Sequence, residues 1–242
     1  MSQSIITVAA AKGGVGKTTL AIALASCLEA VLVDLDHEVG GATGQLMSQQ
    51  AKIGTVLDGL ESGRPPRPRP APSKPALVPA SPELASSQVD PEHVRRSLRA
   101  WAEEWGRPLV ADTAPGHSSA AAGAIAASDL VVVPVPLEVA PIRALAGFLD
   151  EWAGYPVMVV PTMAAPRPAP TMVRELARVV GDRYVAEPIS EHRFLRRRLR
   201  RTSLVLAPGA GAAASRAVAQ FRGLAQEVNE WLNAPEAVAS TR

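Results

Sequence analysis

A glycine-rich loop near the amino terminus places the strongest constraint on the fold of this chain of 242 residues. The loop, Ala11–Thr19, lies between an apolar run, Ile5–Ala10, and a segment with helical periodicity, Thr18–Glu29. Glycines allow the backbone to curl so that several N–H groups point at one phosphate, and the helix that follows adds partial positive charge. A strand, a phosphate loop and a helix in this order predict a nucleotide-binding α/β fold.

The rest of the chain alternates between short apolar runs and amphipathic segments. The predicted strands and helices are Val31–Leu35, Pro91–Trp105, Leu109–Ala111, Leu130–Pro134, Pro141–Trp152, Val157–Val160, Thr171–Val180 and Ala212–Leu232. Runs this apolar must be covered on both faces, which favours a parallel sheet, and parallel strands need crossover helices. We therefore expect one doubly wound domain over residues 1–242, with a mostly parallel sheet flanked by helices.

One proline-rich stretch interrupts this alternation. Residues 64–75 contain six prolines together with Arg64, Arg67, Arg69 and Lys74. Such a segment cannot pair as a central strand and favours extended polyproline geometry. We interpret it as a mobile surface loop inserted before a strand that resumes at Leu77, with a docking motif as the alternative. Residues 233–242 are expected to form a flexible tail.

The composition favours a cytoplasmic protein. The single cysteine, Cys27, excludes an internal disulfide and is interpreted as a small buried residue. The most apolar run, Leu130–Leu137, contains two prolines and is too short to span a bilayer, and the first residues lack a basic leader. We therefore expect no membrane association.

The phosphate loop departs from the strict Walker A pattern. It has Ala11 where that pattern has glycine, and it carries an additional lysine, Lys12, directly before the paired glycines. Lys17 is expected to reach the β- and γ-phosphates, and the Thr18 hydroxyl to ligate Mg²⁺. The nucleotide-binding residues of the loop are predicted to be Gly13, Gly14, Val15, Gly16, Lys17, Thr18 and Thr19.

This run, Lys12–Thr19, resembles the deviant Walker A motif of the ParA/MinD family of P-loop ATPases. The resemblance implies ATP and Mg²⁺ as ligands and a homodimer that forms on ATP binding. It also implies that Lys12 reaches the partner's phosphates. Charge supports that role, because two ATP molecules facing each other repel and a cation in trans offsets the repulsion.

Two acidic motifs follow strands, at the edge of the sheet where ligands bind in open α/β folds. The resemblance assigns catalysis to Asp36, which would orient the attacking water. Asp34 is interpreted as structural, because alternation along the strand turns it away from Asp36. His37-Glu38 stands where the family usually has Pro-Gln. Asp112 resembles the family's magnesium residue, which acts through water.

The similarity continues more loosely downstream. Residues 127–134 resemble the family's fourth-strand motif. Thr162 lies where family members approach the nucleotide base, although many relatives have asparagine there. The resemblance therefore assigns Thr162 and Pro188 to the nucleotide site.

A basic cluster occupies residues 193–201, where six of nine positions are arginine: Arg193, Arg196, Arg197, Arg198, Arg200 and Arg201. On a helix these side chains would project around most of the surface, with Phe194, Leu195 and Leu199 facing inward. Such a patch suits contacts to the DNA backbone without sequence preference, and a solvated basic face is the alternative. The resemblance to ParA proteins implies nonspecific DNA binding here by the ATP dimer.

Two classes of function remain open at this stage. The first is a nucleoid-associated ATP switch that positions a plasmid, chromosome region or organelle with a ParB-like adaptor protein. The second is an ATP-dependent amide ligase of the cobyrinate or dethiobiotin type. Lys12 and the arginines favour the first, and short ParA/Soj proteins without an N-terminal helix-turn-helix are the most similar type. A MinD-like protein is a further alternative, but the apolar stripe of Ala217–Leu232 is interpreted as core.

Overall fold

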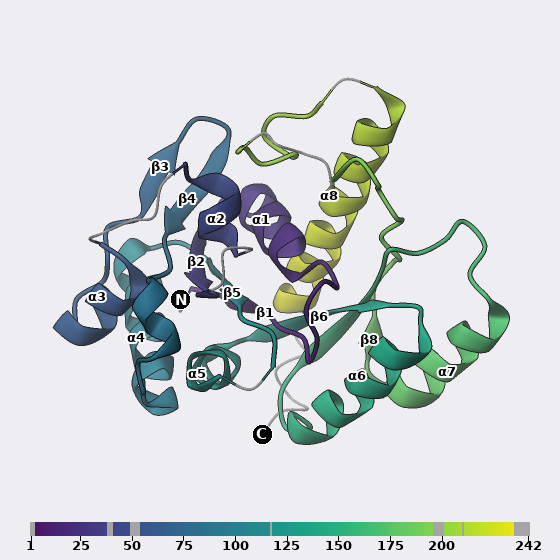
Figure 1. Ribbon diagram of the computed structural model, residues 1–242, viewed down its shortest axis with the longest axis horizontal. Helices are drawn as coiled ribbons and strands as arrows, with labels where there is room; N and C mark the ends of the chain where they lie inside the picture. Colours follow the sequence, from purple (N-terminus) through teal and green to yellow (C-terminus); the bar gives the residue numbers. More distant parts are fainter. Residues whose placement is uncertain are drawn as a thin grey trace.

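The computed structural model describes residues 3–37, 41–48, 54–116, 118–195, 201–209 and 211–234. Within these ranges, eight strands form one sheet in the order β3-β4-β2-β5-β1-β6-β7-β8 (Figure 1). Neighbouring strands pair in parallel except β3 and β4, which pair antiparallel. The strands are β1 Ile5–Val8, β2 Val31–Leu35, β3 Arg69–Ala71, β4 Lys74–Val78, β5 Leu109–Thr113, β6 Leu130–Pro136, β7 Val157–Thr162 and β8 Tyr184–Val185. The expected doubly wound, mostly parallel sheet is confirmed.

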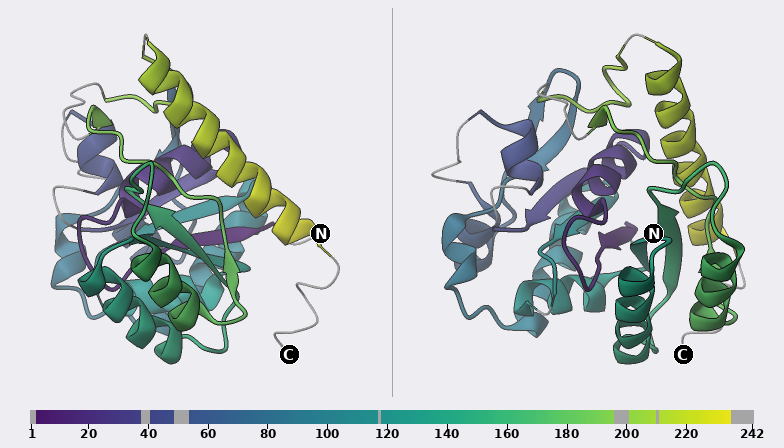
Figure 2. Two further views of the ribbon diagram at one scale, coloured as in Figure 1. Left: turned by 90° about the vertical axis from the view of Figure 1, so that its right-hand side faces the viewer. Right: turned by 45° about the vertical axis from the view of Figure 1, so that its right-hand side comes forward.

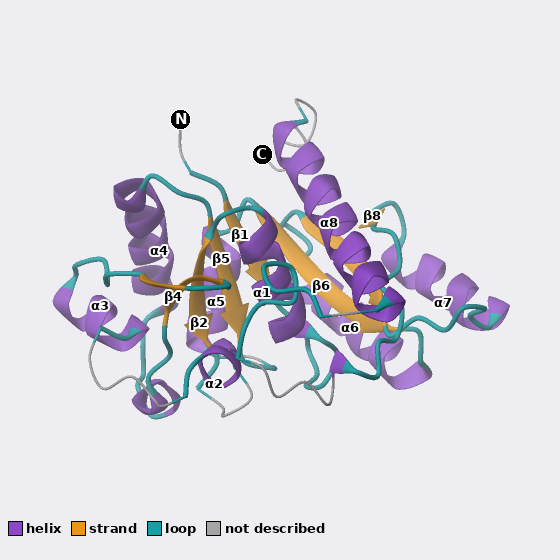
Figure 3. Cartoon of the chain, turned by 90° about the horizontal axis from the view of Figure 1, so that it is seen from above, coloured by secondary structure: helices purple, strands orange, loops and turns teal. Residues whose placement is uncertain are grey.

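Helices cover both faces of this sheet. They are α1 Lys17–Cys27, α2 Ala42–Leu46, α3 Val56–Ser62, α4 Pro91–Trp105, α5 Ser119–Ala127, α6 Val139–Glu151, α7 Pro170–Val180 and α8 Ala212–Asn233, with a 3-10 turn at Pro82–Ala85. Helices α1 and α8 pack on one face, and α3 to α7 pack on the other (Figures 1 and 2). In Figure 3, α1 and α8 lie on the near side of the strands.

Alternation along the strands divides the core between these two layers. In β1, Ile6 and Val8 face α1 and α8, while Ile5 faces α4 and α5. The apolar stripe of α8, including Phe221 and Val228, is buried against the same layer, so it is core as expected. Among the described residues, no helix has both the length and the apolar character needed to cross a bilayer.

Helix α4 has the boundaries that its sequence predicts. Asp90 accepts hydrogen bonds from the backbone N–H groups of Glu92 and His93, and Pro91 occupies the first helical turn. Gly106 ends the helix in the left-handed conformation, with φ of 61°. The helix therefore begins and ends where local chemistry alone dictates.

The prediction of a mobile loop through residues 64–75 is wrong in part. Arg69–Ala71 forms the edge strand β3, which pairs antiparallel with β4. Prolines are tolerated here because an edge strand has one side without ladder hydrogen bonds. Pro66 is buried and packs against Gly59 of α3, where an added Cβ would lie 2.4 Å from Pro66 Cγ. Residues 69–78 therefore form a docked edge hairpin, and residues 64–68 are the loop that leads into it.

Gly123 in α5 is expected to be intolerant of a larger side chain. An added Cβ would lie 2.5 Å from Pro91 O and 2.6 Å from Val94 Cβ, where α5 crosses α4. Gly123→Ala should therefore lower the free energy of unfolding by about 1–3 kcal/mol, measured by urea denaturation. Gly147→Ala is the matched control, because Gly147 lies in α6 with no atom within 4 Å of its added Cβ. That control should be stabilising by about 0.5–1 kcal/mol, and equal losses in both variants would contradict the prediction.

Candidate nucleotide-binding site

The phosphate loop joins β1 to α1. Gly14 and Gly16 have φ of 75° and 102°, and an added Cβ at either would meet nothing within 4 Å. Glycine is required at these positions by backbone conformation and not by crowding. Gly16 is the N-cap of α1, which has no side-chain cap and no acidic residue in its first turn. The first N–H groups of α1 are thus directed at the loop and suit an anion.

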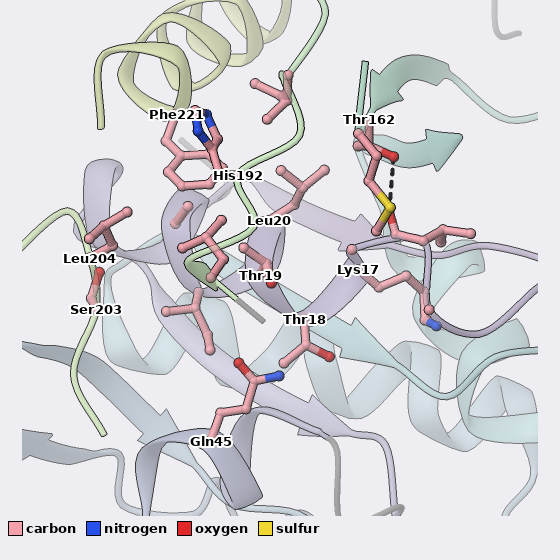
Figure 4. A pocket seen from close by; sticks show the side chains of 18 of the residues that line it. Lys17, Thr18, Thr19, Leu20, Gln45, Thr162, His192, Ser203, Leu204 and Phe221 are labelled. Atoms are coloured by element: carbon pink, nitrogen blue, oxygen red, sulfur yellow. Dashed lines mark hydrogen bonds between the residues drawn. The ribbon is translucent and has the colours of Figure 1, made fainter. Parts of the chain in front are cut away.

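A cavity of about 710 Å³ opens beside this loop. At one end it is lined by the phosphate loop and Asp36, and at another by Thr162, Met163 and residues 189–192. Figure 4 shows side chains from α1, α2, the 201–205 segment and α8 around the cavity. Its volume lies within the usual range for a small-molecule site of about 300–1,000 Å³.

The two lysines of the loop have opposite environments. Lys17 is 6% exposed and lines the cavity, whereas Lys12 is exposed and outside it. A buried ammonium group attracts a phosphate more strongly than an ammonium group in solvent does, because less water screens its charge. Lys17 therefore suits a phosphate in its own subunit, and Lys12 is available to a group outside the monomer.

Asp112 lies at the end of β5 with its side chain fully buried. Neither of its carboxylate oxygens has a hydrogen-bond partner of normal geometry among the described residues. Burial raises the pKa of Asp112 well above its usual range. The negative charge of Asp34 adds to the rise, while the Thr18 hydroxyl lowers the pKa. An unsatisfied buried carboxylate next to Thr18 fits a divalent cation.

The described residues contain no group of three or more acidic, histidine or cysteine side chains that would hold a metal by themselves. Mg²⁺ is usually bound by one or two protein groups, phosphates and water. Thr18 and Asp112 are therefore the residues that would hold it.

Asp34 is buried and ties the start of α2 to β2. Its Oδ1 accepts from the N–H of Asp36 at 3.0 Å, and its Oδ2 accepts from the N–H of Thr43 at 2.6 Å. Burial raises the pKa of Asp34 to about 6, against the lowering effect of these hydrogen bonds. An added Cβ at Gly41 would lie 3.1 Å from both carboxylate oxygens. The structural interpretation of Asp34 is thus supported by its contacts.

The other end of α2 is held by residues far away in the sequence. Lys74 Nζ donates to Leu46 O at 2.6 Å, and the Arg201 guanidinium donates to Met47 O. The backbone N–H of Ser203 donates to Ser73 O at 2.8 Å. Cations at the carboxyl end of a helix satisfy its last carbonyl groups. Helix α2 therefore links the Asp34–Asp36 segment to the edge hairpin and to the end of the basic cluster.

The end of the cavity near Thr162, called the base-side end because the nucleotide base is predicted to lie there, is built on β7. Thr162 Oγ1 donates to Val15 O at 2.9 Å, which joins the end of β7 to the phosphate loop. Ile189, Ser190 and His192 line this end. Pro188 directly precedes these lining residues, and its carbonyl accepts from Gln220 of α8 at 3.2 Å. The assignments of Thr162 and Pro188 to the nucleotide remain predictions.

The structure places only part of the basic cluster. Arg193 is exposed, with its side chain 3.8 Å from Glu191, and Arg201 is exposed beside α2. Phe194 and Leu195 are partly buried against the core, as expected. The described residues 192–195 form a turn where the sequence suggested a helix. Arg196, Arg197, Arg198 and Arg200 lie outside the described residues, as does Glu38.

Comparison with known proteins gives a family and several relatives. A family model described as an AAA domain matches residues 3–151, more than half of the chain. The chromosome partitioning protein ParA of Myxococcus xanthus is 32% identical, over 55% of this chain and 52% of that protein. The chromosome-partitioning ATPase Soj of Thermus thermophilus is 33% identical, over 60% of this chain and 59% of that protein. The match thus spans little more than half the length of either relative.

Solved structures agree with the fold over nearly the whole chain. An ATP complex of a McdA variant from Cyanothece superposes with a TM-score of 0.73 at 16% identity, covering 94% of this chain and 97% of that one. The septum site-determining protein MinD of Pyrococcus horikoshii, complexed with Mg-ADP, gives 0.73 at 19% identity, covering 96% and 98%. At this identity the likeness concerns the fold alone. Together with the family match, these findings show that the chain belongs to the AAA-domain family of ParA/MinD-type P-loop ATPases.

Proposed function

We propose that this chain is an ATP-dependent switch that dimerises on ATP, binds DNA without sequence preference and positions a cargo. The observation that carries the proposal is the pair of lysines on one loop, with Lys17 buried in the cavity and Lys12 exposed beside it. An exposed cation beside the phosphate loop is placed to meet a phosphate of a second subunit, whereas Lys17 is buried in the cavity of its own subunit.

Each residue of the site has a distinct task in this proposal. The N–H groups of the loop and of the first turn of α1 hold the phosphates, and Lys17 offsets their charge. Thr18 and Asp112 would hold Mg²⁺, which neutralises charge on the phosphate oxygens when bound. Asp36 is 6% exposed and lines the cavity, where its carboxylate orients a water molecule for attack.

The link to DNA runs through α2. Its first residues are held by Asp34, next to Asp36, and its last carbonyl groups by Lys74 and Arg201. Arg201 is also the last residue of the basic cluster. A shift of α2 on nucleotide binding would therefore move the end of that cluster, which supports DNA binding that depends on the nucleotide.

The cargo and its adaptor are proposed by analogy with the relatives. The ParA and Soj relatives are named for chromosome partitioning. We propose by analogy a cargo of the same kind, such as a plasmid, a chromosome region or an organelle, and a ParB-like adaptor that stimulates slow hydrolysis. A metabolic ligase on the same scaffold would hydrolyse ATP only in the presence of a small acid.

The test is a mobility shift of nonspecific duplex DNA with ATP, with ADP and without nucleotide. We expect a shift with ATP alone, and we expect size-exclusion chromatography to show a dimer with a nonhydrolysable analogue. Neutralising Arg196, Arg197 and Arg198 together should flatten the slope of log affinity against log salt by about 0.9 for each lost phosphate contact.

A matched control removes the same charge elsewhere on the surface. Arg95, Arg96 and Arg178 are paired with Glu92 or Glu175 on α4 and α7. Neutralising these three should leave the salt slope unchanged. An unchanged slope in the cluster variant would move the DNA site elsewhere, and the absence of any ATP-dependent shift would refute the DNA-binding function.

A further inference from the structure

One glutamine on α8 holds the base-side end of the cavity together. Gln220 Nε2 donates to Pro188 O at 3.2 Å and to Ser190 Oγ at 3.0 Å. Its Oε1 accepts from the N–H of Ser190 at 3.3 Å and lies 2.8 Å from His192 Nε2. A single amide thus contacts the segment 188–192 at three of its residues.

These contacts determine which atom of the Gln220 side-chain amide is the oxygen and which is the nitrogen. Pro188 O is only an acceptor, so the atom facing it must be the NH₂ group of Gln220. The backbone N–H of Ser190 is only a donor, so the atom facing it must be the oxygen. His192 Nε2 faces that oxygen and must therefore carry a proton.

The tautomer of the neutral His192 ring follows from this orientation. In a neutral imidazole with the proton on Nε2, the other nitrogen, Nδ1, is an acceptor. Among the described residues, the side-chain hydrogen bond of His192 is the one at Nε2. The ring lines the cavity (Figure 4). In that tautomer, Nδ1 is the acceptor that this cavity-lining ring carries.

The other side of the segment 188–192 is held by β7 and by the residues that directly follow this strand. The N–H of Ile189 donates to Pro161 O at 2.8 Å, and the N–H of Glu191 donates to Ala164 O at 3.2 Å. Met163, between these two acceptors, has φ of 52°, a left-handed conformation that few residues other than glycine adopt. The wall is thus fixed from the sheet on one side and by Gln220 on the other.

We propose that Gln220 is a positioning residue that sets the base preference of the nucleotide site by orienting His192 as an acceptor. Adenine carries a 6-amino group, which donates, whereas hypoxanthine and guanine carry a 6-oxo group, which accepts. An acceptor held in the wall can pair with the 6-amino group of adenine. Hypoxanthine or guanine would place its 6-oxo group, a second acceptor, against the first, so adenine is favoured. The inference rests on the proposed ATP-binding function and adds to it the residues that select the base.

The test compares ATP with ITP, which differ at this group. Three variants are needed: Gln220→Met, which keeps the length but removes every hydrogen bond, His192→Phe, which keeps a ring, and the control Gln226→Met. Gln226 lies on the same helix and, in the described structure, its amide donates to Glu230 Oε1 at 2.7 Å. The affinities of both nucleotides are measured by competition with a fluorescent analogue.

We expect the unaltered protein and the Gln226→Met variant to prefer ATP over ITP by about threefold to tenfold. Gln220→Met and His192→Phe should bring this ratio close to one, while inorganic tripolyphosphate, which lacks a base, competes equally in all four proteins. In the nucleotide-free protein, hydrogen exchange at the Ser190 amide should become faster in Gln220→Met and stay unchanged in Gln226→Met.

The outcomes separate the two proposals. The role of Gln220 and His192 is refuted if the unaltered protein binds ATP without preferring it over ITP. It is also refuted if the preference for ATP survives in both Gln220→Met and His192→Phe. In either case nucleotide binding itself stands. If the unaltered protein binds neither nucleotide nor tripolyphosphate, the proposed function itself fails. Faster exchange at Ser190 without a change in the ratio would reduce Gln220 to a structural residue and also overturn the inference.

Discussion

Lys17→Ala is expected to cause a severe loss of ATP binding. Lys17 is 6% exposed and lines the cavity next to the glycine turn and the start of α1. Removing one partner of a buried, hydrogen-bonded charge pair costs about 2–5 kcal/mol, which corresponds to a loss of affinity of roughly 30-fold to several thousand-fold. Isothermal titration calorimetry with ATP and Mg²⁺ measures this loss directly.

Lys12→Ala is the matched control, because it makes the same chemical change on the same loop. Lys12 is exposed and does not line the cavity, so its removal should leave ATP binding by the monomer within a few-fold. The dimer formed with a nonhydrolysable analogue should be lost in this variant. Tight ATP binding by Lys17→Ala would contradict the prediction, as would equal losses of monomer binding in the two variants.

The parts of the fold that could be predicted are those whose signal is local. The strand Val31–Leu35 and the helix Pro91–Trp105 agree with the structure at both ends, because an apolar run and an amphipathic stripe with caps define them. Helix α5 was not predicted. Its residues, Ser119–Ala127, are almost all small and apolar, so the helix is nearly uniform around its circumference and shows no stripe.

The docked edge hairpin could not be predicted for a different reason. Proline content argues against a central strand, but whether an edge strand forms depends on a partner, here β4, and on packing such as that of Pro66 on Gly59. Tertiary contacts decided between loop and strand, and local propensity did not. The short helices α2 and α3 were also missed, since five and seven residues give too little periodicity to detect.

In the candidate site, too, the residues of a continuous motif could be predicted and those that act through distant contacts could not. The phosphate loop is a continuous segment, so its residues were predicted from sequence, as was the position of Asp112 after an apolar run. Gln220, Lys74 and Arg201 were not recognised as parts of the site or of its link to α2. They contact residues that lie between 28 and 154 positions away in the chain. No motif marks such a contact, and a lone glutamine on an amphipathic helix is ordinarily a surface residue.

Asp112→Asn is expected to have opposite effects on stability with and without nucleotide. Without nucleotide, the change removes a fully buried carboxyl group whose ionisation is opposed by burial and by the nearby charges of Asp34 and Asp36. Its oxygens have no hydrogen bond of normal geometry among the described residues, so the group costs stability in either protonation state and the variant should unfold at a higher temperature. A gain of about 1 kcal/mol corresponds to a rise of about 2–4 °C for a domain of this size.

With ATP and Mg²⁺, the Asp112→Asn variant should instead unfold at a lower temperature than the unaltered protein. The amide of asparagine is a weaker ligand for Mg²⁺ than a carboxylate, so less of the binding free energy is added to the stability of the variant. Thermal unfolding followed by circular dichroism, with EDTA and then with saturating ATP and Mg²⁺, measures both effects. A lower melting temperature of Asp112→Asn in EDTA would show that its carboxylate is satisfied in a way the structure does not contain.

The control for this experiment is the same change at a satisfied carboxylate. Asp129 accepts two hydrogen bonds from Arg99, at 2.8 and 3.0 Å, and one from the N–H of Ile5 at 2.8 Å. Asp129→Asn weakens these contacts and should lower the melting temperature in both conditions. Opposite signs at Asp112 and Asp129 in EDTA would identify Asp112 as a residue kept for its ligand, since a carboxylate that costs stability in the free protein persists only where binding offsets that cost.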